Sequence, residues 1–509
     1  MNIAKLKYLL PLFIISAAFG ADGGYGSAPH VNGEDLVIFW IIPFAGILLS
    51  IAIFPLVAND FWHHNFGKIS LFWALSLILP FLFHQGFEIT LYEILHVGLL
   101  EYIPFIILLL SLFTISGGVR LKGTLVGTPI LNTTIIFVGT CLASWMGTTG
   151  AAMLLIRPLI RANAHRKQKV HIIVFFIFLV ANIGGSLTPL GDPPLFLGFL
   201  KGVDFFWTTT AMFMPMLFLV VCLLIIFFLL DSFYYKKENI LQAEKEESVK
   251  LGIEGSFNLF LLLGVIGGVL LSGFWRPDIS FEVYYVHLEL QNIARDLLLL
   301  GLTYASWVLT PKRIREGNEY TWFPIVEVAK LFAGIFVTII PAISILKAGT
   351  KGALEKIVSS VSTANGEPID YMYFWLTGIL SSFLDNAPTY LVFFNTSGGS
   401  DKVRQTVINS KDYNPDSLQL QQLLDTGQYA NLFPQALMNE HSTTLLAISA
   451  GAVFMGAVSY IGNAPNFMVK AIAESSDIKM PSFFGYLLKW SIPILMPLFL
   501  ILTYIFFWK

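Results

Sequence analysis

The amino-acid sequence predicts an all-α membrane protein of about ten or eleven spans, built as an inverted repeat with two re-entrant hairpins and two broken helices. The first observation is composition: of 509 residues, 55% are hydrophobic and 13% are charged, whereas soluble domains carry about a quarter charged residues. The second is a series of apolar runs long enough to cross a bilayer, and the third is a match of the chain with itself. The clearest runs are 36–57, 99–116, 209–230, 257–271, 322–346 and 483–508.

The first twenty residues are typical of a secretory signal. Lys5 and Lys7 precede a short apolar stretch over 8–18, and small residues follow at Ala18 and Gly20, as they do before a cleavage site. A retained first helix is the alternative for 1–20. We expect a multi-pass protein of a bacterial-type inner (plasma) membrane, in contact with the lipid bilayer. The net charge of −2 gives no indication of a nucleic-acid partner.

Charged residues indicate how the remaining chain is oriented and divided. Basic residues gather on the cytoplasmic side of membrane proteins, and Arg120 and Arg157 flank both ends of the first expected hairpin. We therefore expect that hairpin to enter from the cytoplasm and the second to enter from outside. The expected segments are an N-terminal repeat over 21–230 with a hairpin at 125–157 and a broken helix at 170–200, a cytoplasmic linker at 231–256, and a C-terminal inverted repeat over 257–509 with a hairpin at 370–395, a polar insertion at 396–429 and a broken helix at 441–475.

The two halves share short matching segments. Residues 143–151 align with 381–389 at an offset of 238, and residues 185–194 align with 456–465 at an offset of 271. The polar insertion accounts for the difference between the two offsets. Because the first hairpin is expected to enter from inside and the second from outside, the match indicates an inverted repeat, which is the usual architecture of secondary transporters.

The second matching segment cannot remain helical. Its first copy contains Pro189, Pro193 and Pro194 among several glycines, and proline removes a backbone donor and clashes with the preceding turn. A span broken in mid-membrane leaves helix ends facing a cavity, where carbonyl groups attract a cation and N–H groups attract an anion. The second copy should break its helix over 459–466 in the same way.

Polar side chains gather at these breaks and at the hairpin tips. Neutral groups include Ser144, Thr148, Thr149, Asn182, Ser186, Thr188, Ser382, Asn386, Thr389, Ser459, Asn463 and Asn466, and the carboxylates are Asp192 and Asp385. Hard cations such as sodium prefer oxygen ligands, and a carboxylate at membrane depth is by default a functional candidate. Each Ser or Thr could instead bond its own or a neighbouring helix. Asp192 and Asp385 could instead cap the helices that follow them.

Motifs for other chemistries are missing from the sequence. It contains no GxxxxGK[ST] nucleotide loop, no HExxH and no CxxC, so we expect neither an enzyme nor a cofactor. Sodium is expected only as a transported or coupling ion.

Two stretches resemble a known superfamily. Residues 381–389, Ser-Ser-Phe-Leu-Asp-Asn-Ala-Pro-Thr, resemble the second hairpin of the ion transporter superfamily, and 182–194 resemble its first broken helix. That superfamily includes NhaD-type sodium/proton antiporters, citrate and dicarboxylate carriers, and arsenite permeases. The resemblance covers most of the chain after the signal region. NhaD-type proteins commonly carry Asp-Asn in both hairpins, whereas this chain has Gly147 and Thr148 at the first tip.

The resemblance implies a homodimer in which a scaffold holds two mobile transport units. It also implies two sites for sodium or substrate, each formed by one hairpin tip and one broken helix. By position, the first would contain Ser144, Thr148, Thr149, Thr188 and Asp192, and the second Ser382, Asp385, Asn386, Thr389, Ser459 and Asn463.

Three functions follow as expectations. The leading one is a sodium/proton antiporter, with Asp385 and Asp192 as proton carriers and sodium at Asp385 and Asn386. The second is a sodium- or proton-coupled citrate or dicarboxylate transporter. Neither broken segment contains an arginine for a carboxylate substrate, which favours antiport. The third is a channel or membrane scaffold without coupled transport.

Overall fold

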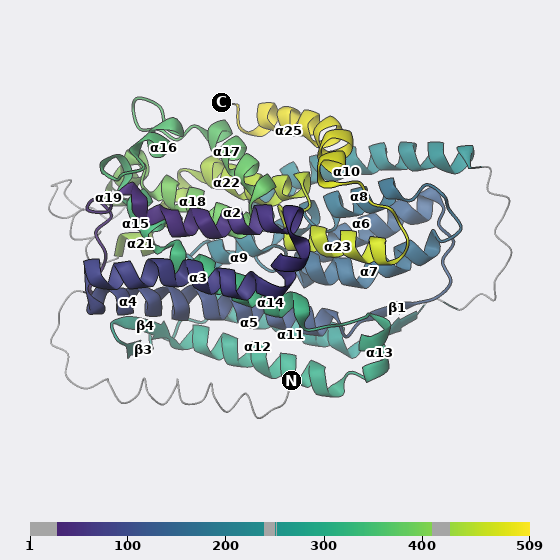
Figure 1. Cartoon of the computed structure of the whole chain (residues 1–509), viewed down its shortest axis with the longest axis horizontal. Coiled ribbons are helices and arrows are strands. Elements are labelled where there is room, and N and C mark those ends of the chain that lie inside the picture. Colours follow the sequence, from purple (N-terminus) through teal and green to yellow (C-terminus); the bar gives the residue numbers. More distant parts are fainter. Residues whose placement is uncertain (1–27, 239–249, 251, 410–427, 509) are drawn as a thin grey trace.

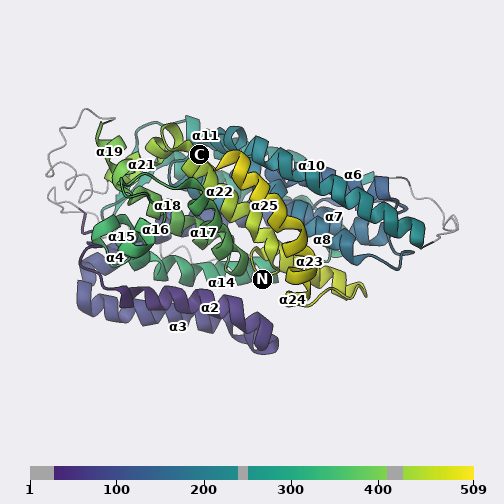
Figure 2. The ribbon, with the colours of Figure 1, turned by 90° about the horizontal axis from the view of Figure 1, so that it is seen from above.

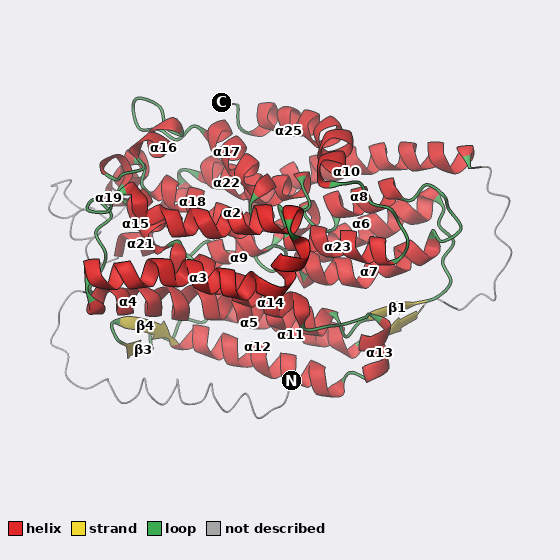
Figure 3. Cartoon of the chain, in the orientation of Figure 1, coloured by secondary structure: helices red, strands yellow, loops and turns green. Residues whose placement is uncertain are grey.

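A computed structural model describes residues 28–238, 250, 252–409 and 428–508, so the expected signal at 1–20 lies outside the described residues. Helices dominate these residues, with two short strand pairs among them (Figure 3). Within the described residues, eight helices are long and apolar enough to cross a membrane, and the number of spans is up to ten if each of two bent pairs counts as one. The predicted fold class, an all-α multi-span membrane protein, is confirmed.

The N-terminal helices form a layer of long rods. Figure 2 shows α2 and α3 side by side along one edge, with α14 beside them and α10 at the opposite edge. Prolines in the first turn help to start α2, α5 and α14, because proline needs no hydrogen-bond acceptor there. These elements are η2 (Ile38–Ile41), α2 (Ile42–Val57), α3 (Asn59–Gln85), α4 (Phe87–Val97), η3 (Gly98–Tyr102) and α5 (Ile103–Ser116).

The first repeat continues with a helical hairpin and an interrupted helix (Figure 1). The Gly127 N–H donates to the Ala162 carbonyl at 2.7 Å, so the hairpin's two ends lie together. Thr128 caps its first helix by accepting from the Leu131 N–H at 3.2 Å. The elements are β1 (Arg120–Lys122), α6 (Pro129–Met146), α7 (Thr148–Ala162), α8 (Val170–Leu179), η4 (Ile183–Leu187), α9 (Pro193–Leu200) and α10 (Phe205–Lys237).

The second repeat has the same order after additional helices. Its hairpin, α17 and α18, also closes at its base, where the Ser400 hydroxyl donates to the Gly366 carbonyl at 2.9 Å. The elements are β2 (Gly252–Glu254), α11 (Phe257–Phe274), β3 (Ser280–Val283), β4 (Val286–Glu289), α12 (Leu290–Leu309), α13 (Lys312–Gly317), α14 (Phe323–Thr338), α15 (Ile340–Lys347), η5 (Gly349–Lys351), α16 (Glu355–Ser360), α17 (Asp370–Phe383), α18 (Asn386–Gly398), α19 (Asp401–Asn409), α21 (Gln428–Asn439), α22 (Ser442–Met455), η6 (Gly456–Val458), α23 (Ala464–Ser475), α24 (Phe483–Tyr486), η7 (Leu487–Ser491) and α25 (Ile492–Phe506).

Two expected loops are partly helical. Helix α10 runs through Lys237, past the expected start of the linker at 231, because Asp231 is fully buried among polar partners rather than in water. The end of that linker pairs as β2 with β1 in an antiparallel ribbon. The polar insertion at 396–429 contains the end of α18, all of α19 and the start of α21, and its residues 410–427 lie outside the described part.

The hairpins pack across the repeats. Helix α7 of the first hairpin contacts α23 of the second broken helix, and α18 of the second hairpin contacts α9 of the first. The two breaks and the two hairpin tips therefore meet between the repeats.

Candidate functional site

Both broken helices have the same backbone path through their gaps. After the 3-10 turn η4, Thr188 is extended (φ −138°, ψ 159°), and after η6, Ser459 is extended as well (φ −136°, ψ 168°). Asp192 and Asn463 then precede α9 and α23 in similar extended conformations. Each pair is 271 residues apart, so the offset found by aligning the sequence reappears in the backbone.

Glycine permits the close backbone approach inside each gap. A Cβ on Gly191 would lie 2.1 Å from the Gly185 carbonyl oxygen, and a Cβ on Gly462 would lie 2.6 Å from that of Gly456. No side chain fits at such a separation. The two segments can therefore fold back on themselves only with glycine at these positions.

Four hydroxyl groups fasten the hairpins to the breaks. Ser144 Oγ donates to the Gly184 carbonyl at 2.5 Å, and the Thr188 hydroxyl donates to the Ser144 carbonyl. In the second repeat, Ser382 Oγ donates to the Met455 carbonyl at 3.0 Å, and the Ser459 hydroxyl donates to the Ser382 carbonyl. Because these hydroxyls satisfy backbone carbonyls that the helix ends leave free, they have a structural task.

Asp192 lies at the centre, buried and held by three side chains. It accepts from Asn386 Nδ2 at 2.6 Å, from Asn463 Nδ2 at 3.0 Å and from Thr148 Oγ1 at 3.3 Å. Asn463 is the counterpart of Asp192 in the second repeat, while Thr148 and Asn386 are counterparts of each other at the two hairpin tips. The residues predicted for the first site and those predicted for the second therefore meet at Asp192.

A chain of amides extends from this centre. Asn463 Nδ2 also donates to Asn182 Oδ1 at 3.2 Å, and Asn182 Nδ2 donates to Asn466 Oδ1 at 2.7 Å. Asn466 Nδ2 in turn donates to the carbonyls of Gly456 and Ser459, both at 2.8 Å. All three asparagines are buried, and they connect one break directly to the other.

The second hairpin tip is capped by its own carboxylate. Asp385 Oδ1 accepts from the Ala387 N–H at 3.1 Å, and Thr389 Oγ1 donates to the Asp385 carbonyl at 3.0 Å. Asp385 is partly exposed, whereas Asn386 beside it is buried. The capping interpretation of Asp385 therefore holds in the structure, and an ion-binding role remains compatible with it.

The first hairpin tip has no such cap. Gly147 (φ 79°) precedes α7, and no side chain accepts from the N–H groups of the first turn. Thr148 donates its N–H to the Gly191 carbonyl at 2.9 Å. Thr149 is partly exposed at this tip. A helix N-terminus without a side-chain cap favours an anion.

Two buried oxygen atoms near this centre have no hydrogen-bond partner among the described residues. They are Asn386 Oδ1 at the second tip and Ser186 Oγ in the first break. Neutral oxygens are suitable ligands for a hard cation. The described residues contain no group of three or more His, Cys, Asp or Glu side chains suited to a metal ion.

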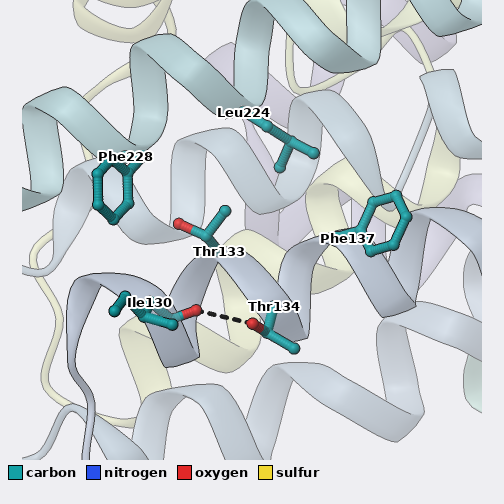
Figure 4. A pocket seen from close by; sticks show the side chains of 6 residues that line it. All are labelled: Ile130, Thr133, Thr134, Phe137, Leu224 and Phe228. Atoms are coloured by element: carbon teal, nitrogen blue, oxygen red, sulfur yellow. Dashed lines mark hydrogen bonds between the residues drawn. The ribbon is translucent and has the colours of Figure 1, made fainter.

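The described residues also form a groove away from this centre. About 240 Å³ in volume, it lies between α6 and α10 (Figure 4). The Thr133 and Thr134 hydroxyls donate to carbonyls of their own helix, so the groove presents apolar groups, and Ile130 is 70% exposed. The lining of this groove is therefore mostly apolar and poorly suited to a small ion. Its lining residues are Ile130, Thr133, Thr134, Phe137, Leu224 and Phe228.

Sequence reasoning missed a second buried polar cluster. Arg166, His171 and Asp231 lie together with Asn132 and Asn163 at the base of the first hairpin. The available signal was the position of Asp231, directly after the apolar run that ends at Leu230. The sequence predicts that this acid begins the linker at 231–256, whereas α10 continues through it to Lys237.

Comparison with known families identifies the family of this chain. A family model with the description "Putative citrate transport" matches residues 33–507. Comparison with curated proteins gives no match.

Proposed function

Since the chain belongs to this citrate-transport family, we propose that it is a secondary transporter that carries a carboxylate of the citrate class together with a cation. The chain is a multi-pass membrane protein and a transporter by family. The identity of the substrate, the coupling ion and the homodimer are our proposals. The sodium/proton antiport expected from the sequence remains a prediction that the family match does not support.

The observation that carries the proposal is the uncapped N-terminus of α7. Its first turn presents N–H groups and the Thr149 side chain beside the break of the first repeat. A carboxylate substrate needs such donors, and the sequence provides no arginine in either broken segment. The α9 N-terminus is a poor substitute, because Pro193 and Pro194 have no N–H to offer.

The cation follows from charge balance. Asp192 is buried, and a carboxylate substrate bound at the adjacent tip would add more negative charge at membrane depth. Such a charge is costly without a partner. We propose that a proton or a sodium ion accompanies the substrate, held by Asp192 with the unpartnered oxygens of Asn386 and Ser186 as further ligands.

Proteoliposomes loaded with unlabelled citrate test the substrate. Uptake of labelled citrate by counterflow is expected, and competition by dicarboxylates and by monocarboxylates would define the class. Uptake driven by an imposed sodium or pH gradient would identify the coupling ion. Failure of every carboxylate to elicit counterflow, with protein correctly inserted, would reject the proposal.

Antiport is the second candidate, favoured by Asp385, a partly exposed carboxylate at the tip that neighbours the buried Asn386. Everted vesicles with a pH-sensitive dye would separate the two. Antiport predicts alkalinisation of the lumen on adding sodium without any carboxylate, and loss of that signal in Asp385→Asn. A carboxylate transporter predicts no response until citrate is present.

A further inference from the structure

The base of the first hairpin contains a fully buried ion pair. Arg166 Nη1 donates to Asp231 Oδ1 at 2.5 Å. The same carboxylate accepts from His171 Nε2 at 2.8 Å and from Asn132 Nδ2 at 2.9 Å. All four side chains are at most 2% exposed, so the ionic contacts are shielded from water.

These residues come from three helices and the loop between α7 and α8. Asn132 is on α6, Arg166 follows α7, His171 is on α8 and Asp231 is on α10. Asn132 and Asn163 also exchange amide hydrogen bonds at 3.0 and 2.7 Å, which joins α6 to the end of α7. Asp231 is therefore the point where the base of the hairpin is attached to the first broken helix and to α10.

The position of the tip depends on this attachment. Helix α7 rises about 1.5 Å per residue, so Thr148 lies roughly 22 Å from Asn163 along the helix. A small rotation at the base produces a larger displacement at the tip. The Thr148 side chain donates to Asp192 at 3.3 Å, the longest of the three hydrogen bonds that hold Asp192, and the Thr148 N–H donates to the Gly191 carbonyl at 2.9 Å.

The second repeat carries counterparts of two of these residues. At the hairpin offset of 238, Asn132 corresponds to Asp370 and Arg166 to Arg404. Arg404 donates to the carbonyl of Lys347 at the end of α15, where a cation is favoured by the helix dipole. Asp370 accepts from Thr444 on α22 at 2.7 Å. A buried arginine at the base is thus a repeated feature of both hairpins.

We propose that Asp231 is a positioning residue: by pairing with Arg166, it fixes the angle of the α6–α7 hairpin and so holds Thr148 against Asp192. The residue acts on the tip from a distance and does not touch the transported species. The inference is independent of which substrate the protein carries.

Paired spin labels test the proposal without any substrate. Cys141 and Cys222 are first replaced by alanine, and labels are placed at Trp145 near the tip and Phe206 at the start of α10, both substantially exposed. In Asp231→Asn, Arg166 loses its nearer charge partner and keeps only Glu238, whose Oε2 lies 3.6 Å from Arg166 Nε. The distance distribution should then broaden with an added longer population. The double variant Asp231→Asn with Arg166→Gln removes both charges and should restore the narrow distribution.

A surface ion pair made by the same hairpin provides a matched control. Arg157 on α7 pairs with the exposed Glu319 at 3.0 Å, and Glu319→Gln should leave the distribution unchanged. If Asp231→Asn does not yield monodisperse protein, His171→Leu, which removes one donor and leaves the ion pair, should give a smaller broadening. Unchanged distributions in the purified variants, or equal broadening in Glu319→Gln, would overturn the proposal.

Discussion

The two hairpin tips occupy equivalent places in the two repeats and differ in charge. At the first tip, Gly147 leaves the N-terminus of α7 without a side-chain cap. At the second, Asp385 occupies the equivalent position and caps α18 through the Ala387 N–H. The first tip can therefore accept an anionic ligand, while the second already contains the Asp385 carboxylate. The backbone differs there too, because φ is 79° at Gly147 and −61° at Asp385. An inverted repeat can therefore place different ligands at equivalent tips.

The same division appears in the broken helices. Asp192 in the first break corresponds to the neutral Asn463 in the second, and the two side chains contact each other at 3.0 Å. Two carboxylates at that separation would repel each other strongly in a membrane. The asymmetry in charge is what allows the two copies to approach so closely.

The largest expected effect comes from removing the charge of Asp192. Asp192→Asn keeps the size of the side chain but loses charged acceptors for Asn386, Asn463 and Thr148. Hydrogen bonds to a charged group are worth up to about 3 kcal/mol, so transport should fall by roughly a hundredfold. Initial transport rates in proteoliposomes measure this fall. Near-normal transport by this variant would show that the charge at the centre is dispensable.

Glycine substitutions compare the two breaks directly. Gly191→Ala should destabilise the protein by about 2 to 3 kcal/mol, the upper part of the range for overpacking, because its Cβ would lie 2.1 Å from a backbone oxygen. Gly462→Ala should cost less, since the equivalent separation is 2.6 Å. Thermal unfolding of the detergent-purified variants ranks them. The reverse order would mean that the second break is the tighter one.

Much of this architecture could be predicted, because the breaks have a local cause. Pro189, Pro193 and the glycines prevent a continuous helix whatever surrounds them, and the helix is interrupted there in the structure. The partners of Asp192 could not be predicted in the same way. Its contacts with Asn386 and Asn463 join residues 194 and 271 positions apart, and only the packing of one repeat on the other brings them together. The predicted linker start at 231 is wrong for the same reason, because the burial of Asp231 depends on α6, on α8 and on the loop between α7 and α8.

Capping at the second tip predicts a smaller effect. Asp385→Ala should destabilise α18 by about 1 kcal/mol, whereas Asp385→Asn should change stability by a few tenths, because asparagine caps as well as aspartate. Thermal unfolding gives the stability, and transport of the same two variants gives the function. If Asp385→Asn keeps its stability but loses transport, the carboxylate acts in transport as well as in capping. If both variants transport normally, its role is confined to the cap.

The smallest expected effect tests whether the open tip binds the substrate. The counterpart of Thr149 in the second hairpin is Ala387, so Thr149→Ala gives the first tip the side chain that the second already has. Loss of one hydrogen bond from this partly exposed hydroxyl costs about 1 kcal/mol, and the KM for citrate should rise by roughly fivefold with little change in maximal rate. Ala387→Ser is the matched control, because α18 is already capped and an added hydroxyl there should leave the KM unchanged. An unaltered KM in Thr149→Ala would place the carboxylate elsewhere and remove the functional distinction between the two tips.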